Sequence, residues 1–336
     1  MPLAFNKTYP RLWSLDAGSA MLVTDLHGDW DAYQRYRDRF AELQAKGQAD
    51  CLVITGDLIH ADPPIQDSSL LIIQDILKLR AIYGQAIIYL CGNHELPHIY
   101  GFGLSRGKRE YTPPFEAALS DSAHRSEVIE LLSGLPLYLR TAAGVSVAHA
   151  GAADVMADAN NALKVFTWDH QRGLAEADAF LATQNIEGMR RAYARLSQAQ
   201  SYEELAKHYL AVSDPLDARY DDLLRGFIVT ANPDFQVLYS ALFTRCEQEY
   251  GLAEYTETLQ LILQHLSTTY APQRVLIAGH IAVQNGFQVI AEKHLRIASG
   301  SHAKPRKSGR YLLFDTARPI NQAADLLPNL HSVYTG

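Results

Sequence analysis

Polar residues that can bind a metal ion follow five short apolar runs of the sequence. The runs are MLVTD (21–25), CLVITGD (51–57), AIIYLCGN (86–93), GVSVAHAG (144–151) and RVLIAGH (274–280). The polar residues at or just after their ends are Asp25, His27, Asp57, Asn93, His149 and His280. This mixed set of oxygen and nitrogen donors suits manganese, iron or zinc, whereas calcium prefers nearly all-oxygen ligation. Six ligands are enough for two divalent ions about 3.5–4 Å apart if one carboxylate bridges them.

The apolar runs predict buried β-strands, because they are short and rich in Val, Ile and Leu. Two further runs, HLRIAS (294–299) and YLLFDT (311–316), have the same character. Helix-like segments at about 29–46 and 66–83 separate the first three runs, and this alternation predicts right-handed crossovers and a largely parallel sheet. Loops at the carboxyl ends of such strands converge on one crevice, so the six polar residues can meet although they are far apart in sequence.

Between residues 152 and 270 the sequence consists mainly of long helix-like stretches rather than short apolar runs. Stretches such as SYEELAKHYLAV carry helical spacing and helix-favouring residues, which predicts a mainly helical insertion. Neither a low-complexity tract nor a Gly/Ser linker separates this segment from the rest. We therefore expect a single domain over residues 1–336, with 152–270 as an insertion or cap.

Composition restricts the class of protein. Of the 336 residues, 48% are hydrophobic and 20% are charged, as expected for a globular protein, and the net charge of −7 argues against nucleic acid as the main partner. The three cysteines are too few for a disulfide framework. An apolar stretch of about 18 residues, the length needed to span a membrane, is absent. These features predict a cytoplasmic protein without a membrane partner.

Each candidate ligand also has an ordinary structural interpretation. Asp25 and Asp57 are of the type that caps helices, Asn93 is of the type found in turns, and a single histidine is more often structural than a ligand. The ordered recurrence of these residues after strand-like runs favours a metal site. The other histidines are interpreted as structural: His98, His124, His170, His208, His265, His294, His302 and His331.

Five short motifs carry a resemblance to a known family. They are DLHG (25–28), GD (56–57), GNHE (92–95), HAG (149–151) and GH (279–280). In this order they resemble the motifs of the calcineurin-like metallophosphoesterases, and most closely those of the phosphoprotein-phosphatase branch. The resemblance extends over about residues 21–316, including the segment ASGSHAKPRKSG (298–309), but not over most of the insertion.

The resemblance implies a fold and a set of ligands. The fold is a four-layer αββα sandwich, in which two mixed sheets pack face to face and a two-metal site lies at one edge. Asp25 and His27 are expected to bind the first divalent ion, and Asp57 is expected to bridge the two ions. The second ion is expected to have three further ligands, which are Asn93, His149 and His280.

The resemblance also implies a metal-dependent phosphatase that acts on a phosphorylated substrate, most closely a phosphomonoesterase. Two cations lower the pKa of a bridging water from about 15.7 toward 7, so a hydroxide becomes available to attack phosphorus. His94 is expected to protonate the leaving group as general acid, with Glu95 as its support. Two alternatives stay open: a nucleotide or diadenosine-polyphosphate hydrolase with the same site, and a non-catalytic metal-binding scaffold that binds a partner through its helical insertion.

The sequence departs from the phosphoprotein-phosphatase pattern after Gly56-Asp57. The branch has an Asp that orients the catalytic histidine and an Arg that clamps the phosphoryl group, whereas this chain has His60 and Ala61. His60 or Asp62 is a candidate for the orienting role. Candidates for a phosphate contact, chosen by charge alone, are Arg106, Lys108, Arg109, Arg172, Lys304, Arg306 and Lys307, of which Arg106, Arg109, Arg172 and Arg306 are preferred.

Overall fold

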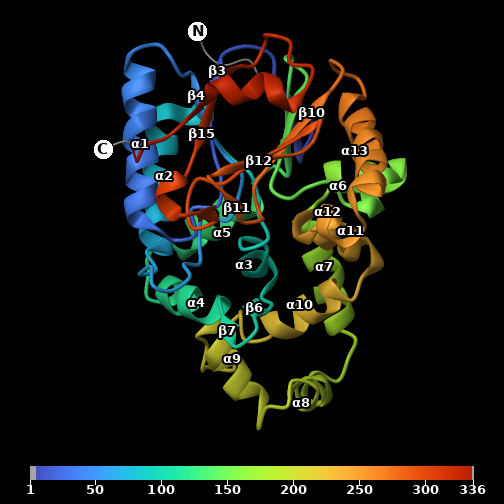
Figure 1. The fold of residues 1–336 in the computed structure, drawn as a ribbon. Helices are drawn as coiled ribbons and strands as arrows, with labels where there is room; N and C mark the ends of the chain where they lie inside the picture. The colour runs from blue at the N-terminus through green and yellow to red at the C-terminus, as the bar shows by residue number, and fades with distance from the viewer. Residues whose placement is uncertain (1–4, 335–336) are drawn as a thin grey trace. The chain divides into compact units, whose positions relative to one another are not determined.

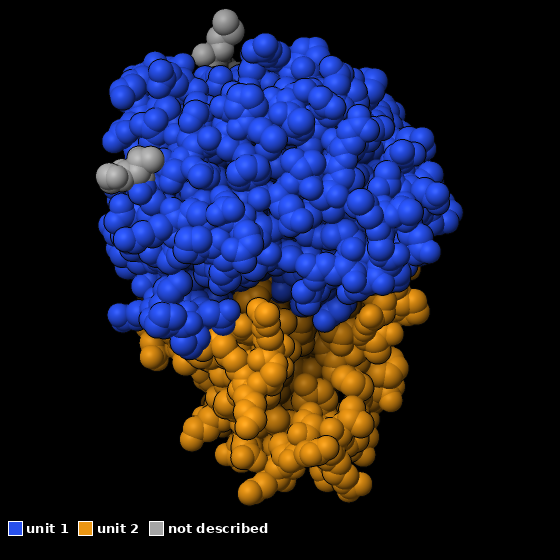
Figure 2. Space-filling model, viewed as in Figure 1, with its two compact units in different colours: residues 1–93, 135–168, 237–336 blue, residues 94–134, 169–236 orange. Residues whose placement is uncertain are grey.

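The computed structural model describes residues 5–334, which form two compact units. Unit 1 consists of residues 1–93, 135–168 and 237–336, and unit 2 consists of residues 94–134 and 169–236. The two units are drawn in blue and orange in Figure 2. All strands of the two large sheets belong to unit 1, so this unit contains the architecture that the apolar runs predict.

Unit 1 contains a seven-stranded and a five-stranded sheet. The first has the order β1 (Phe5–Tyr9), β2 (Leu12–Leu15), β8 (Tyr138–Thr141), β9 (Val145–Ala148), β10 (Val275–Ala278), β13 (His294–Ile297) and β12 (Phe287–Ala291). The second has the order β16 (Leu330–His331), β15 (Tyr311–Asp315), β3 (Ser19–Val23), β4 (Cys51–Ile54) and β5 (Ile87–Tyr89). Two short strands, β11 (Val283–Gln284) and β14 (Ala303–Lys304), pair separately.

The two sheets pack face to face around one apolar core. Leu22 and Val53 of the five-stranded sheet belong to the same buried cluster as Val147, Ile277 and Leu295 of the seven-stranded sheet. Helices α1 (Trp30–Ala45) and α2 (Ser69–Tyr83) lie outside one sheet, and α6 (Ala159–Phe166) and α13 (Leu252–Ser267) lie outside the other (Figure 1). The predicted four-layer αββα sandwich is therefore confirmed.

The carboxyl ends of the central strands lie at one edge of this sandwich. Strands β3, β4 and β5 run parallel to one another, and so do β9, β10 and β13. Thr24, just after β3, ties the two sheets together: its backbone N–H donates to Oγ of Ser299 over 2.9 Å, and its hydroxyl donates to the carbonyl of Ile297 over 2.9 Å. Loops that leave these strands consequently start close together.

The segment between the fourth and fifth motifs is helical, as predicted. It contains η2 (Asp154–Ala157), α6, α7 (His170–Leu181), α8 (Ile186–Leu196), α9 (Tyr202–Leu210), α10 (Asp222–Thr230), α11 (Pro233–Phe243), α12 (Cys246–Glu249) and α13. Its first and last helices belong to unit 1, because α6 and α13 pack on the sandwich. The expectation of one domain with a cap over 152–270 stays a prediction.

Unit 2 has its own apolar core. Tyr202, Leu205 and Leu210 of α9 pack with Leu223 and Leu224 of α10. The unit also contains the segment before the fourth motif, which forms α3 (Leu96–Tyr100), β6 (Ser105–Arg106), β7 (Arg109–Glu110), α4 (Thr112–Ser120) and α5 (Arg125–Ser133). Within residues 5–334, no helix combines the length and apolar character needed to cross a membrane. The three cysteines are buried and unbridged.

Candidate metal centre

All six predicted metal ligands lie in loops at the carboxyl edge of unit 1. Asp25 and His27 follow β3, and Asp57 follows β4. The remaining predicted ligands follow β5, β9 and β10 and are Asn93, His149 and His280. Neither aspartate is a helix cap, because Asp29 caps α1 and Ser68 precedes α2. Their side chains approach one another in two groups.

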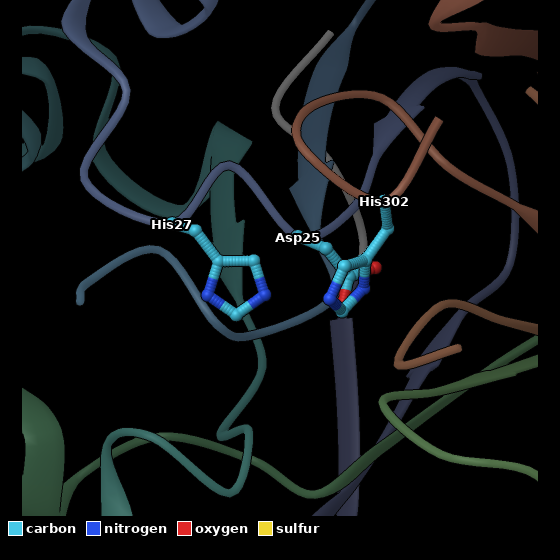
Figure 3. A group of neighbouring side chains, drawn as sticks. All are labelled: Asp25, His27 and His302. Atoms are coloured by element: carbon cyan, nitrogen blue, oxygen red, sulfur yellow. The ribbon is translucent and has the colours of Figure 1, made fainter. Parts of the chain in front are cut away.

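The first group consists of Asp25, His27 and His302, and one ligand atom of each lies within 4.8 Å of the others. Figure 3 shows both imidazole rings beside the Asp25 carboxylate. Nδ1 of His302 lies 3.4 Å from Oδ1 of Asp25, and the two rings have centroids 4.6 Å apart. His302 was interpreted from the sequence as structural, but the loop that follows β13 brings it into this group.

The second group consists of Asp57, His149 and His280, again with ligand atoms within 4.8 Å of one another. Nε2 of His149 lies close to a ligand atom of each neighbouring residue. This atom lies 3.5 Å from Oδ1 of Asp57 and 2.8 Å from Oδ1 of Asn93. It also lies 3.1 Å from Nδ1 of His280. Asn93 thus joins the group through its amide oxygen, a donor of the type expected for a divalent ion.

Asp57 faces both groups. Its Oδ2 atom lies 3.7 Å from Nε2 of His27, whereas its Oδ1 atom lies 3.5 Å from Nε2 of His149. The carboxylate is almost completely buried, with 1% of its surface exposed. One oxygen toward each group is the arrangement expected of a bridging carboxylate. The bridging role itself stays a prediction.

Four of the predicted ligand residues have a strained backbone. Asp25, His27, Asp57 and His280 have φ values of 47°, 44°, 50° and 67°, in the left-handed region that L-residues rarely adopt. Each such residue costs about 1–3 kcal/mol and persists only where its surroundings hold it. The His27 N–H donates to the Asp57 carbonyl over 2.9 Å, and the His280 N–H donates to Oδ1 of Asp25 over 2.8 Å. Strain concentrated at these positions is typical of a functional site.

Gly279 provides the space that the Asp25 carboxylate occupies. A Cβ atom at this position would lie 1.9 Å from Oδ2 of Asp25 and 2.9 Å from Cβ of Thr24. We expect Gly279→Ala to displace the Asp25 side chain and to weaken metal binding about 10-fold or more, as losses around a metal site typically do. The measurement is metal affinity by competition with a chromophoric chelator. Gly173→Ala in α7 is the control, because this helical glycine has no positive φ and the atom nearest to its added Cβ would be Cγ1 of Val229 at 4.0 Å. Equal affinities in both variants would contradict the prediction.

The protonation states suit metal ligands. Burial raises the pKa of Asp25, but the neighbouring histidines, His302 first among them, outweigh this effect and hold the pKa below its usual range. Burial, reinforced by His302, lowers the pKa of His27 to about 3. Burial and His149 lower the pKa of His280 well below its ordinary value. At neutral pH the carboxylate is therefore charged and these rings are neutral, as metal binding requires.

Several contacts of the site are unfavourable without a cation. Among residues 5–334, neither Oδ2 of Asp25 nor Nδ1 of His302 has a hydrogen-bond partner, although both atoms are buried. Nδ1 of His149 lies 2.9 Å from the Thr55 carbonyl and must donate to it, because a carbonyl only accepts. In a neutral ring Nε2 is then an acceptor, and it faces the acceptor Oδ1 of Asn93. Divalent cations fit this donor set.

The residues predicted to act as acid and support are in unit 2. Glu95 is fully buried and directly precedes α3. The ring of His94 packs edge-to-face on Tyr111, with centroids 4.9 Å apart. Their catalytic roles stay predictions.

The basic residues proposed from charge alone have varied surroundings. Arg306 makes a bidentate pair with Asp29, the N-cap of α1, over 2.6 and 2.8 Å, and this leaves fewer of its donors for a phosphoryl group. Arg172 is 78% exposed in its side chain and pairs with Glu176. Arg109 lies over the Tyr111 ring, and Arg106 is exposed in β6. Their assignment to substrate stays a prediction.

The departure from the phosphoprotein-phosphatase pattern is visible at the loop after Asp57. His60 is buried, has a φ of 71°, and donates its backbone N–H to Oγ of Ser69 over 2.7 Å. Ala61 is fully buried. The position that carries a phosphate-clamping Arg in the branch is thus filled by a methyl group inside the unit. Any phosphate clamp must come from elsewhere in the chain.

The chain is similar to several solved structures. The chain is 16% identical to a mutant of a cold-active protein tyrosine phosphatase, with a TM-score of 0.50 over 93% of this chain and 79% of that one. A cold-active protein tyrosine phosphatase from a psychrophilic Shewanella species is 15% identical, with a TM-score of 0.43 over 93% and 79% of the two chains. A serine/threonine phosphatase from Saccharomyces cerevisiae is 13% identical, with a TM-score of 0.46 over 91% and 77%.

No curated protein matches the sequence. The model of the calcineurin-like phosphoesterase family matches residues 19–207, which is more than half of the chain. This range includes the predicted ligands from Asp25 to His149, and unit 1 brings His280 beside them. The chain therefore belongs to the calcineurin-like phosphoesterase family.

Proposed function

We propose that the protein is a phosphomonoesterase of the phosphoprotein-phosphatase-like branch that uses two divalent ions, of manganese, iron or zinc. The observation that carries the proposal is the position of Asp57, whose carboxylate has one oxygen near each of the two ligand groups. One group lies at Oδ2 of this carboxylate and the other at Oδ1. A carboxylate placed in this way holds two ions close enough to act on one phosphoryl group.

The side chains have distinct parts in this proposal. Asp25, His27 and Asp57 would hold one ion, and Asp57 would also hold the other ion with the second ligand set, which is Asn93, His149 and His280. When bound, the two ions supply a hydroxide nucleophile at neutral pH and offset negative charge on the phosphoryl oxygens. The Thr55 carbonyl accepts the Nδ1 proton of His149 and so keeps Nε2 of that ring directed toward its ligand group.

His94 is proposed as the general acid. It follows the ligand Asn93 directly in the GNHE motif, and the family resemblance gives the histidine of this motif the role of proton donor. Protonation of the leaving oxygen spares it from departing as an anion, which contributes about 10²–10⁴-fold to the rate. Glu95 is proposed to support this ring.

A second candidate function is favoured by the buried Ala61, which replaces the phosphate-clamping arginine of the protein phosphatases. A nucleotide or diadenosine-polyphosphate hydrolase needs the same pair of ions but no protein-binding groove. Contacts to phosphate by Arg106, Arg109, Arg172 or Arg306 are compatible with either substrate class. A non-catalytic scaffold is less well supported, because such a protein has no need of two complete ligand groups.

A substrate panel tests the proposal. The Mn²⁺-loaded protein is assayed with p-nitrophenyl phosphate, its bis ester, phosphoserine and phosphotyrosine peptides, and diadenosine tetraphosphate. The phosphotyrosine peptide is included because a structure of similar fold is a protein tyrosine phosphatase. Hydrolysis of monoesters in preference to the bis ester and the dinucleotide supports the proposal, whereas preference for diadenosine tetraphosphate supports the second candidate. Absence of hydrolysis by the metal-loaded protein would contradict both.

A further inference from the structure

We propose that His302 is a fourth protein ligand of the first ion, together with Asp25, His27 and Asp57. This inference rests on the proposed function, since it concerns the same pair of ions. It adds a residue from the end of the chain to a ligand set that the five motifs do not include.

The His302 ring is directed at the Asp25 carboxylate (Figure 3). Nδ1 lies 3.4 Å from Oδ1 of Asp25, yet among the described residues this nitrogen makes no hydrogen bond. Oδ2 of Asp25 makes none either, although the whole side chain is buried. A buried ring nitrogen and a buried carboxylate oxygen that both lack a hydrogen-bond partner, on two side chains this close together, are expected where a cation binds both.

The backbone of the loop after β13 holds the His302 ring near Asp25. The loop after β13 carries Gly300, and a Cβ atom there would lie 2.6 Å from the carbonyl oxygen of Asp25. Only glycine therefore allows the loop to pack this closely on the Asp25 backbone. The His302 carbonyl accepts the N–H of Val283 over 2.9 Å, and the N–H of Ala303 donates to the Gly300 carbonyl over 3.0 Å. These bonds fix the loop from both sides.

A structural role in the core is a poor alternative for His302. The side chain is 16% exposed, so the ring is neither a filler of the core nor a surface residue. Its ring neighbour is His27, another member of the ligand group, with a centroid distance of 4.6 Å. A hydrogen bond that positions Asp25 is the remaining alternative, and substitutions of His302 separate this role from ligation.

With His302 as a ligand, the two ions would have the same number of protein ligands. The first ion receives two imidazole nitrogens and two carboxylates, and the second receives two imidazole nitrogens, one carboxylate and one amide oxygen. Each ion would thus have four protein ligands, and the hydroxide of the proposed function would be a further ligand in an expanded set.

The test compares His302→Ala with His331→Ala. His331 is exposed in β16 and belongs to neither ligand group, so it is a matched control within unit 1. Metal content is measured by mass spectrometry after dialysis against a graded chelator, and the visible spectrum of the Co²⁺ form is recorded. We expect two ions in the wild type and in the control. In His302→Ala we expect at least about a 10-fold weaker affinity for one ion, with a changed Co²⁺ spectrum.

Two further variants distinguish ligation from positioning. His302→Asp supplies an oxygen ligand but cannot donate to Asp25, whereas His302→Gln keeps a donor for Asp25. Recovery of the affinity by Asp supports ligation. Recovery by Gln alone would overturn it in favour of a positioning role, and unchanged affinity in His302→Ala would overturn both. A wild type that binds no ion would instead contradict the proposed function, so the two failures are distinguishable.

Discussion

Asp57→Asn is expected to lose most of both metal ions and to lower kcat/KM by at least about 10³-fold, more than the loss of one oxyanion-stabilising donor costs. The Asp57 carboxylate lies near both ligand groups, at 3.7 Å from His27 and 3.5 Å from His149. An amide keeps one acceptor oxygen but carries no charge, so it cannot bridge two cations as a carboxylate does.

The measurement is metal stoichiometry per chain, with the rate on p-nitrophenyl phosphate measured on the same sample. Asp38→Asn is a suitable control, because this exposed aspartate of α1 pairs with Arg37 and lies outside both ligand groups. Two ions bound to Asp57→Asn at the wild-type affinity would show that Asp57 is not a bridge.

His94→Ala is expected to keep both ions but to hydrolyse substrates with poor leaving groups about 10²–10⁴-fold more slowly. An alkyl phosphate needs a proton on its departing oxygen, whereas p-nitrophenolate is stable as an anion. The rate on p-nitrophenyl phosphate should therefore fall much less. A plot of log kcat/KM against the leaving-group pKa, for wild type and variant, measures the difference in slope.

His124→Ala serves as the control for this series. His124 belongs to unit 2, as His94 does, and is exposed and paired with Glu127. Its slope should equal that of the wild type. Parallel slopes for His94→Ala and the wild type, with the same loss on every substrate, would argue that His94 is not the acid.

The strands around the site were predictable from the sequence because their residues are buried along their whole length. All four residues of β4, β9 and β10 are buried, which yields the continuous apolar runs that the sequence shows. The positions of the six predicted ligands followed from one rule, the convergence of loops at the carboxyl ends of parallel strands. Both the apolar runs and the polar residues that follow them can be read from the local sequence.

Strand β8 was not predicted, because its sequence YLRT includes a charged residue, which argues against a buried strand. The fold nevertheless buries all four residues. Arg140 is fully buried and donates to Oγ of Ser14 and to the carbonyls of Leu266 and Thr268. These partners are distant in sequence, so local periodicity gave no sign of them. Long-range packing likewise assigns residues 94–134 to unit 2, although the helices of this segment precede the predicted insertion.

His302 could have been found by the rule that found the other ligands. The run HLRIAS was recognised as a strand, and His302 follows the end of β13 by five residues. The five motifs include His280 but have no counterpart for a histidine at this place. The parallel pairing of β13 with β10 is what brings its loop to the same edge.

Metal content measured together with activity tests the central claim most directly. The purified chain is stripped with a chelator and titrated with Mn²⁺ or Zn²⁺, and bound metal and phosphomonoester hydrolysis are followed on the same samples. We expect saturation at two ions per chain, with hydrolysis absent in the stripped protein and restored as the second ion binds. Full hydrolysis by the stripped protein, or a titration in which the chain binds no metal, would contradict the two-ion site.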